Sequence, residues 1–187
     1  ERLPGVHRIL TAKDLPRHRF GRYLKDLVLL AEDRVLYCGE PLALVVAVDE
    51  ETATEARDRI RVTYEPLPPL VDPLAAMDEE QFLLHPDIAS YAASWNAVKK
   101  GNVCSKTTIR RGNVREGFDR ADVVLENTYE TPAVHQCPLE TQVAIASRDL
   151  SGRLQVTMPT QLPFGNQYLL AEALGRKPSE ICVHATP

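Results

Sequence analysis

Residues 39–68 read GEPLALVVAVDEETATEARDRIRVTYEPLP, and this stretch decides the expected fold. The apolar run Leu42–Val48 follows a turn and precedes a charged segment, which is typical of a central strand buried on both faces. Asp49 can cap a helix over Glu50–Arg59, where alanines recur at helical spacing. Arg61–Glu65 alternates as a half-exposed strand and stops at a run of prolines. The stretch therefore predicts a strand–helix–strand unit with two parallel neighbouring strands.

The second half of the chain has a different pattern. We expect strands over 121–131, 142–146 and 153–158, the last two antiparallel and joined by a turn at 149–152. A helix that begins at Pro163, ends at Gly175 and leads into another strand at 181–184 is expected next.

Between these halves, residues 73–105 show little periodicity apart from a possible helix end at 77–80. We expect an irregular connection there. The fold class predicted for the whole chain is α+β.

Composition limits the classes of function. The 187 residues carry a formal net charge of −4 and show no cluster of basic residues, so nucleic acid is not an expected partner. No apolar run approaches the ~20 residues that span a bilayer, and we expect no membrane association. The 4 cysteines are widely spaced, without zinc-finger spacing, and as reduced thiols they favour a cytoplasmic location. Five scattered histidines argue against a closed metal cage.

Two short segments carry candidate chemistry. In HQCPLET (135–141), His135 and Cys137 could form a nucleophilic pair, although a turn with a buried thiol and a satisfied imidazole is the preferred interpretation. In MPTQLPFG (158–165), Gln161 lies where a strand runs into a helix start, and its amide could hold an anionic or oxo ligand. The alternative is a simple turn with Gln161 in water. Glycine-rich phosphate-binding motifs are absent.

Several motifs together resemble a known family. The segments PGV (4–6), LTAKDLP (10–16), GEPLALVVA (39–47) and IRVTYEPLP (60–68) resemble the hammerhead domain of the xanthine dehydrogenase, aldehyde oxidase and carbon monoxide dehydrogenase family. RGNV (111–114), ADVVLE (121–126), HQCPLET and TQLP (160–163) follow in the order of that family's molybdenum-binding region. The resemblance implies a hammerhead domain over 1–75, a connection over 76–105, and the truncated N-terminal part of a molybdopterin-binding domain over 106–187, with its first strands and helix.

The resemblance also implies a chemistry and a set of partners. In this family, molybdenum on a pterin dithiolene, here expected in its cytosine dinucleotide form, hydroxylates an electron-poor carbon with oxygen derived from water. The substrate would be a small molecule, namely a purine, an N-heterocycle or an aldehyde. Electrons leave through iron–sulfur and FAD centres on partner domains or subunits, and a homo- or hetero-oligomer is expected. The cofactor carries out the hydroxylation chemistry, and the protein positions the cofactor and the substrate and provides the electrostatic environment.

A family role is assigned to a residue of this chain only where that residue matches the family motif. The family counterpart of Gln161 hydrogen-bonds an oxo ligand of molybdenum, and His135 and Glu140 match a supporting pattern. Asn113 stands where an aspartate is usual. The general base and the glycine-rich loop of the family would follow Pro187, so no complete catalytic set and no metal ligand is expected here. Because the chain also opens without Met, we expect a fragment that alone is inactive and holds no cofactor.

Two alternatives remain open. The chain could be a non-catalytic subunit-interaction module that uses the hammerhead fold, in which case its reading frame would stop at Pro187. It could also be a cysteine-dependent hydrolase using Cys137 and His135. The spacing from His135 to Glu140 is similar to the carbon monoxide dehydrogenase branch, but the cysteine-bearing loop of that branch is not in the chain, so the substrate stays open.

Overall fold

The computed structural model describes residues 3–78, 82–94 and 97–186. The chain divides into two units, Glu1–Lys106 with Ala144–Pro187, and Thr107–Val143. The first unit holds three small sheets, and the second holds one short helix. The mixed helix and strand content confirms the predicted α+β class.

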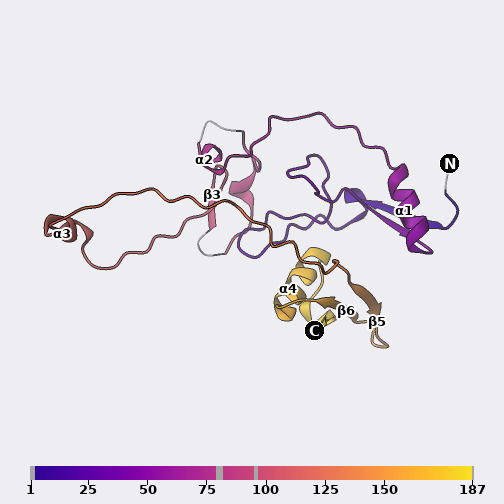
Figure 1. The fold of residues 1–187 in the computed structure, drawn as a ribbon. Coiled ribbons are helices and arrows are strands. Elements are labelled where there is room, and N and C mark those ends of the chain that lie inside the picture. Colours follow the sequence, from indigo (N-terminus) through magenta and orange to yellow (C-terminus); the bar gives the residue numbers. More distant parts are fainter. Residues whose placement is uncertain (1–2, 79–81, 95–96, 187) are drawn as a thin grey trace. The chain divides into compact units, whose positions relative to one another are not determined.

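The first sheet pairs β1 (Val6–Thr11) with β2 (Ala43–Ala47) in antiparallel register. Helix α1 (Glu50–Arg59) follows β2 and packs against it (Figure 1). The helix begins as predicted, because Asp49 Oδ1 accepts a hydrogen bond of 2.8 Å from the N–H of Thr52. Hydrogen bonding to the Thr52 side chain, and secondarily to its backbone N–H, lowers the pKa of the Asp49 carboxyl.

Two predictions for this region are wrong. Strand β2 is not a central strand: within the described residues it pairs only with β1, and Leu44 and Val46 are 48% and 43% exposed. The segment 61–65 forms no strand, and Tyr64 is 59% exposed. An apolar run shows only that a strand is able to be buried. Whether it is buried depends on packing against segments that are distant in sequence.

A loop over residues 20–27 connects distant parts of the first unit. Leu24 is 5% exposed and packs with Ile88 and Tyr91, which are equally buried. The backbone N–H of Lys25 donates to the carbonyl of Ala92 at 2.9 Å. The loop therefore fixes residues 88–94 next to itself, although about 65 positions separate them in sequence.

The region expected to be an irregular connection contains regular elements. It holds α2 (Pro73–Ala76), a 3-10 helix (Ile88–Ser90) and a hairpin of β3 (Ala97–Lys100) and β4 (Val103–Ser105). Helix α2 ends at Ala76 with Met77 as its C-cap, Asp78 is not helical, and residues 79–80 of the predicted helix end lie outside the described residues. The strands were missed because they are short and lack a clear alternation.

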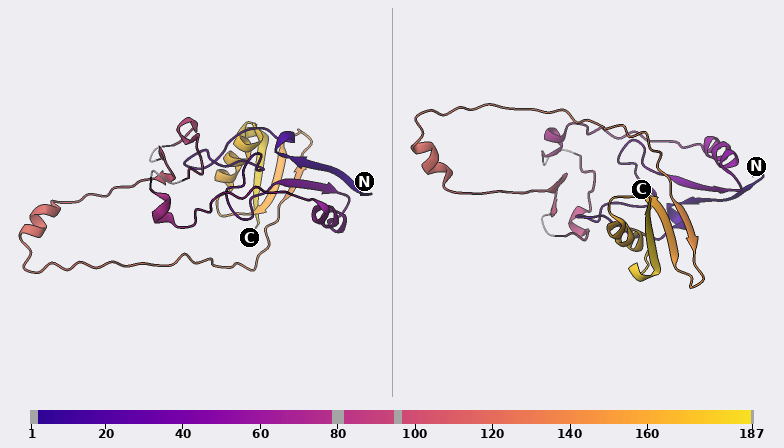
Figure 2. Two further views of the ribbon diagram at one scale, coloured as in Figure 1. Left: turned by 90° about the horizontal axis from the view of Figure 1, so that it is seen from above. Right: turned by 60° about the horizontal axis from the view of Figure 1, so that its bottom comes forward.

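The third sheet agrees best with the elements predicted from the sequence. Its order is β5 (Ile145–Arg148), β6 (Leu154–Pro159) and β7 (Ile181–Thr186), with β5 antiparallel and β7 parallel to β6. Helix α4 (Pro163–Leu174) forms the crossover and packs on β7 (Figure 2). The predicted helix, the turn at 149–152 and the strands at 153–158 and 181–184 are confirmed, whereas the strand expected over 142–146 lies at 145–148 and residues 142–144 form no strand.

Small side chains let α4 lie close to this sheet. Ala171 and Ala173 are 2% exposed, and Ile181 on β7 is fully buried. The helix ends at Gly175, whose φ of 64° is left-handed as predicted. In the turn before β6, hydrogen bonds led by the Ser151 hydroxyl lower the pKa of Asp149.

The second unit is described by itself. Helix α3 (Val114–Asp119) begins at Asn113, whose side chain accepts the N–H of Glu116 at 3.2 Å. The predicted strand over 121–131 is wrong, because no strand is formed there and Leu125 is 84% exposed. Alternation becomes a strand only where a neighbour satisfies the backbone N–H and C=O groups, and the described part of this unit contains no such neighbour.

A glycine in the connecting loop supports a first prediction. A Cβ built on Gly21 would lie 2.1 Å from the backbone carbonyl oxygen of Leu24, and its φ is +153°. We therefore expect Gly21→Ala to lower the free energy of unfolding by about 2 kcal/mol or more, because backbone cannot move aside as a flexible side chain can. Urea denaturation followed by circular dichroism measures the change.

Gly39→Ala is the matched control. Gly39 also has a positive φ of +91°, but a Cβ there would meet nothing within 4 Å. The control should cost only the strain of a left-handed alanine, about 1 kcal/mol. Equal losses in the two variants would show that the predicted clash at Gly21 is absent.

Candidate functional site

The candidate site is the turn between β6 and α4. Strand β6 ends at Pro159, α4 begins at Pro163, and Gln161 is exposed between them. The hydroxyl of Thr160 accepts two hydrogen bonds, from the N–H of Leu162 at 3.0 Å and from Nδ2 of Asn166 at 2.7 Å. This hydroxyl therefore holds the backbone on both sides of Gln161.

The start of α4 favours an oxygen ligand with negative charge. No side chain caps the helix at Leu162, and Pro163 has no N–H to donate. The positive end of the helix dipole consequently lies next to Gln161. Within the described parts of the chain, the Gln161 amide has no hydrogen-bond partner, so its Nε2 is free to donate.

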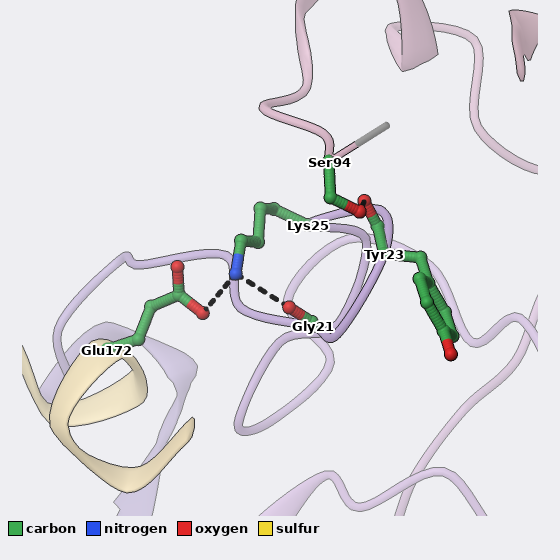
Figure 3. A network of polar contacts seen from close by, with 5 residues as sticks. All are labelled: Gly21, Tyr23, Lys25, Ser94 and Glu172. Atoms are coloured by element: carbon green, nitrogen blue, oxygen red, sulfur yellow. Dashed lines mark hydrogen bonds and ion pairs between the residues drawn. The ribbon is translucent and has the colours of Figure 1, made fainter. Parts of the chain in front are cut away.

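Contacts from two directions fix α4 in place. On the sheet side, Nε2 of Gln167 donates to the carbonyls of Pro178 at 3.0 Å and Ile181 at 2.7 Å. On the other side, Nζ of Lys25 lies 2.8 Å from Oε2 of Glu172 (Figure 3). The turn that carries Gln161 thus precedes a helix that is anchored along its length.

The other predicted site residues lie in the second unit. Nδ1 of His135 is 3.3 Å from Sγ of Cys137 and accepts the N–H of Cys137 at 2.9 Å. Cys137 has a φ of 47°, which fits the expected turn, but the prediction that its thiol is buried is wrong because it is exposed. Glu140 is exposed and contacts neither His135 nor Cys137 among the described residues.

This arrangement lacks the third member of a nucleophilic triad. A catalytic Cys/His pair needs a group that orients the imidazole. Nδ1 already accepts a backbone N–H, and no carboxylate of the described residues contacts His135. The geometry offers a local turn rather than a hydrolase site.

Two residues of the turn were not singled out from sequence. Thr160 and Asn166 form the hydrogen bond that shapes the turn, yet only Gln161 was expected to matter. The role of Asn166 could have been predicted from its position in the first turn of the expected helix. From that position, a short amide side chain can hydrogen-bond to residues just before the helix.

A polar cavity of about 470 Å³ lies elsewhere in the first unit. Within it, Arg17 pairs with Glu32 at 2.5 Å, and the Arg19 guanidinium lies 4.3 Å from the centre of the Tyr91 ring. His85 also contacts Tyr91, and burial lowers the pKa of its imidazole. Arg17, Arg19 and His85 each already have a partner among the residues that line the cavity.

Within the described ranges, no group of three or more His, Cys, Asp or Glu side chains could hold a metal ion. None of the helices in this described part of the chain is long and apolar enough to cross a membrane. The turn between β6 and α4 offers hydrogen-bond donors, namely the Gln161 amide and the start of α4.

Comparisons with known proteins identify the family. Residues 1–68 match the family model described as "Aldehyde oxidase and xanthine dehydrogenase, a/b hammerhead domain". Residues 96–187 match the model described as "Molybdopterin cofactor-binding domain", which includes the turn at Gln161. The chain belongs to this molybdenum-binding family. The resemblance seen in sequence is therefore confirmed.

Curated members of the family align over most of the chain. A probable xanthine dehydrogenase subunit of Bacillus subtilis is 31% identical over 100% of this chain and 24% of its own length. A carbon monoxide dehydrogenase large chain of Afipia carboxidovorans is 35% identical over 86% of this chain and 21% of its own length. The chain thus spans about a quarter of the length of these relatives.

Solved structures agree with the fold. The aldehyde oxidoreductase of Desulfovibrio desulfuricans superposes with a TM-score of 0.80 at 22% identity, over 98% of this chain and 20% of that structure. A Cu,Mo-CO dehydrogenase gives a TM-score of 0.71 at 32% identity, over 97% of this chain and 24% of that structure. Because the identity to the aldehyde oxidoreductase is only 22%, that similarity shows a shared fold alone. The expected domain boundaries at 75 and 105 stay a prediction.

The hydroxyl that shapes the turn supports a second prediction. Thr160→Val keeps the shape of the side chain but removes the acceptor for Leu162 and Asn166. We expect the free energy of unfolding to fall by about 1 kcal/mol, together with faster hydrogen exchange at the Leu162 amide. Thr157→Val on β6 is the control, since no hydrogen bond of the Thr157 side chain is found in the described residues. Unchanged exchange at Leu162 in Thr160→Val would contradict the assignment.

Proposed function

We propose that the chain is part of the molybdenum-cofactor subunit of an oxidoreductase that hydroxylates an electron-poor carbon with oxygen derived from water. The observation that carries the proposal is the turn between β6 and α4, with the free amide of Gln161 beside an uncapped helix start. The turn lies inside the segment matched by the molybdopterin cofactor-binding model.

The donors at the turn fit an oxygen ligand of molybdenum better than they fit the metal itself. Gln161 would donate from Nε2 to that oxygen, and the start of α4 would stabilise its negative charge. When bound, the molybdenum cofactor supplies oxygen transfer and two-electron redox chemistry. Because the amide is neutral and does not take up a proton, Gln161 would orient the oxygen and leave proton transfer to another group. Thr160 and Asn166 would hold the backbone of Gln161 in position.

His135 and Glu140 are proposed as supporting residues of the same site. This role comes from the family resemblance. Their proposed function is to shape the neighbourhood of the cofactor rather than to react with the substrate.

Further proposals concern cofactors, partners and location. Relatives named as subunits or as large chains support iron–sulfur and FAD partners, in a homo- or hetero-oligomer. The cytosine dinucleotide form of the pterin is also proposed. Relatives carry the names xanthine dehydrogenase, nicotinate dehydrogenase and aldehyde oxidase, so purines, N-heterocycles and aldehydes all stay candidate substrates. The four free cysteines favour the cytoplasm.

The chain by itself gives a third prediction. It spans about a quarter of the length of the relatives and, in the described residues, has no group of three or more His, Cys, Asp or Glu side chains that could hold a metal ion. We expect the purified 187-residue chain to contain no molybdenum or pterin and to oxidise neither xanthine nor an aldehyde. Metal analysis and a dye-reduction assay check this, and a positive result in either would overturn it.

A fourth prediction tests Gln161 in a longer polypeptide. If a longer reading frame carries this segment, the complete subunit should be expressed with its partners. Gln161→Ala should then lower kcat/KM by about 10- to 100-fold while the molybdenum content stays within about twofold. Asn113→Asp, on the exposed start of α3, should leave both quantities unchanged.

The outcomes separate the alternatives. Full activity of the Gln161→Ala subunit would remove Gln161 from the site. A reading frame that stops at Pro187, with no redox activity of the complex, would favour the non-catalytic interaction module. A hydrolytic activity lost in Cys137→Ala would favour the cysteine-dependent hydrolase.

A further inference from the structure

A groove of about 500 Å³ lies along α4, beside the loop that contains Gly21 and Lys25. Its apolar lining comes mainly from α4 and includes Leu162, Tyr168, Leu169 and Ala171. The groove has the size of a site for a small organic molecule, for which volumes of about 300–1,000 Å³ are usual.

The charges around the groove are not balanced. Glu172 is the carboxylate among its lining residues, and Lys25 already pairs with it at 2.8 Å (Figure 3). Arg22 and Arg176 also line the groove, and neither has an ion-pair partner in the described part of the chain, although the Arg22 guanidinium lies 5.4 Å from the centre of the Tyr23 ring. Two cationic groups are therefore available to a ligand.

We propose that this groove binds a small organic anion with an apolar body, of which an aromatic carboxylate is the simplest example. A guanidinium matches a carboxylate with two parallel hydrogen bonds, and the apolar lining removes the ring from water. A neutral ligand would leave the two arginines without a carboxylate partner, and a purely polar anion would gain nothing from Leu162 and Leu169.

Gly165 gives a way to fill the groove without disturbing the fold. It lines the groove, and a Cβ built on it would meet only Leu162 Cβ at 3.5 Å, an ordinary contact. Replacement by methionine also raises helix propensity. Gly165→Met should therefore occupy the space of the ligand while leaving the thermal midpoint unchanged or higher.

The experiment titrates the chain with 1-naphthoate and with its uncharged counterpart 1-naphthamide, with backbone amide NMR as the readout. Naphthoate should shift the resonances of Leu162, Gly165 and Leu169, and it should bind about tenfold more tightly than the amide. Binding should weaken as salt rises, because screening reduces the attraction of exposed charges.

Single variants locate the contacts. Arg22→Gln and Arg176→Gln should each weaken naphthoate binding by threefold to tenfold, and Gly165→Met should abolish it. Arg153→Gln, which removes a charge next to the β5–β6 turn and away from the groove, should leave the affinity unchanged.

Three results would overturn the proposal: no binding of naphthoate up to its solubility limit, equal binding of the acid and the amide, or binding that survives Gly165→Met. No cofactor is needed for the measurement, and Gln161 does not line the groove. A failure of the groove proposal would therefore not affect the proposed molybdenum site. A failure of the molybdenum-site proposal would likewise not affect the groove.

Discussion

Lys25 joins three parts of the first unit through two of its nitrogen atoms, the side-chain Nζ and the backbone N. Its Nζ donates to Glu172 on α4 and to the carbonyl of Gly21 at 2.6 Å, and its backbone N–H donates to Ala92. The side chain is 27% exposed and that of Glu172 is 33% exposed, so the pair is only partly screened by water. The importance of the contact is geometric: it gives one loop a fixed place against α4 and against residues 91–94.

The turn that carries Gln161 depends on this arrangement. A free amide can select a ligand only when the backbone below it does not move. Thr160 and Asn166 supply local rigidity, Gln167 ties the helix to the start of β7, and Lys25 holds the opposite face. The site residue therefore needs no packing of its own and stays exposed.

The sequence predicted those parts of the fold whose signals are local. The cap at Asp49, the proline at the start of α4 and the glycine after it each act within a few residues, and each proved correct. Strands over 61–65 and 121–131 did not form, because a strand requires a partner that local alternation does not specify. The same limit applies to the site. The turn that carries Gln161 could be predicted from its neighbours, whereas the contact between Lys25 and Glu172 joins residues 147 positions apart.

This separation has a consequence for the order of folding. The layer of β6, α4 and β7 lies within residues 154–186, so its contacts close short loops and can form early. The Lys25–Glu172 contact closes a far longer loop, whose entropy must be lost before the contact contributes any stability. We expect the ion pair to be absent from the folding transition state, so that removing it accelerates unfolding and leaves the folding rate nearly unchanged.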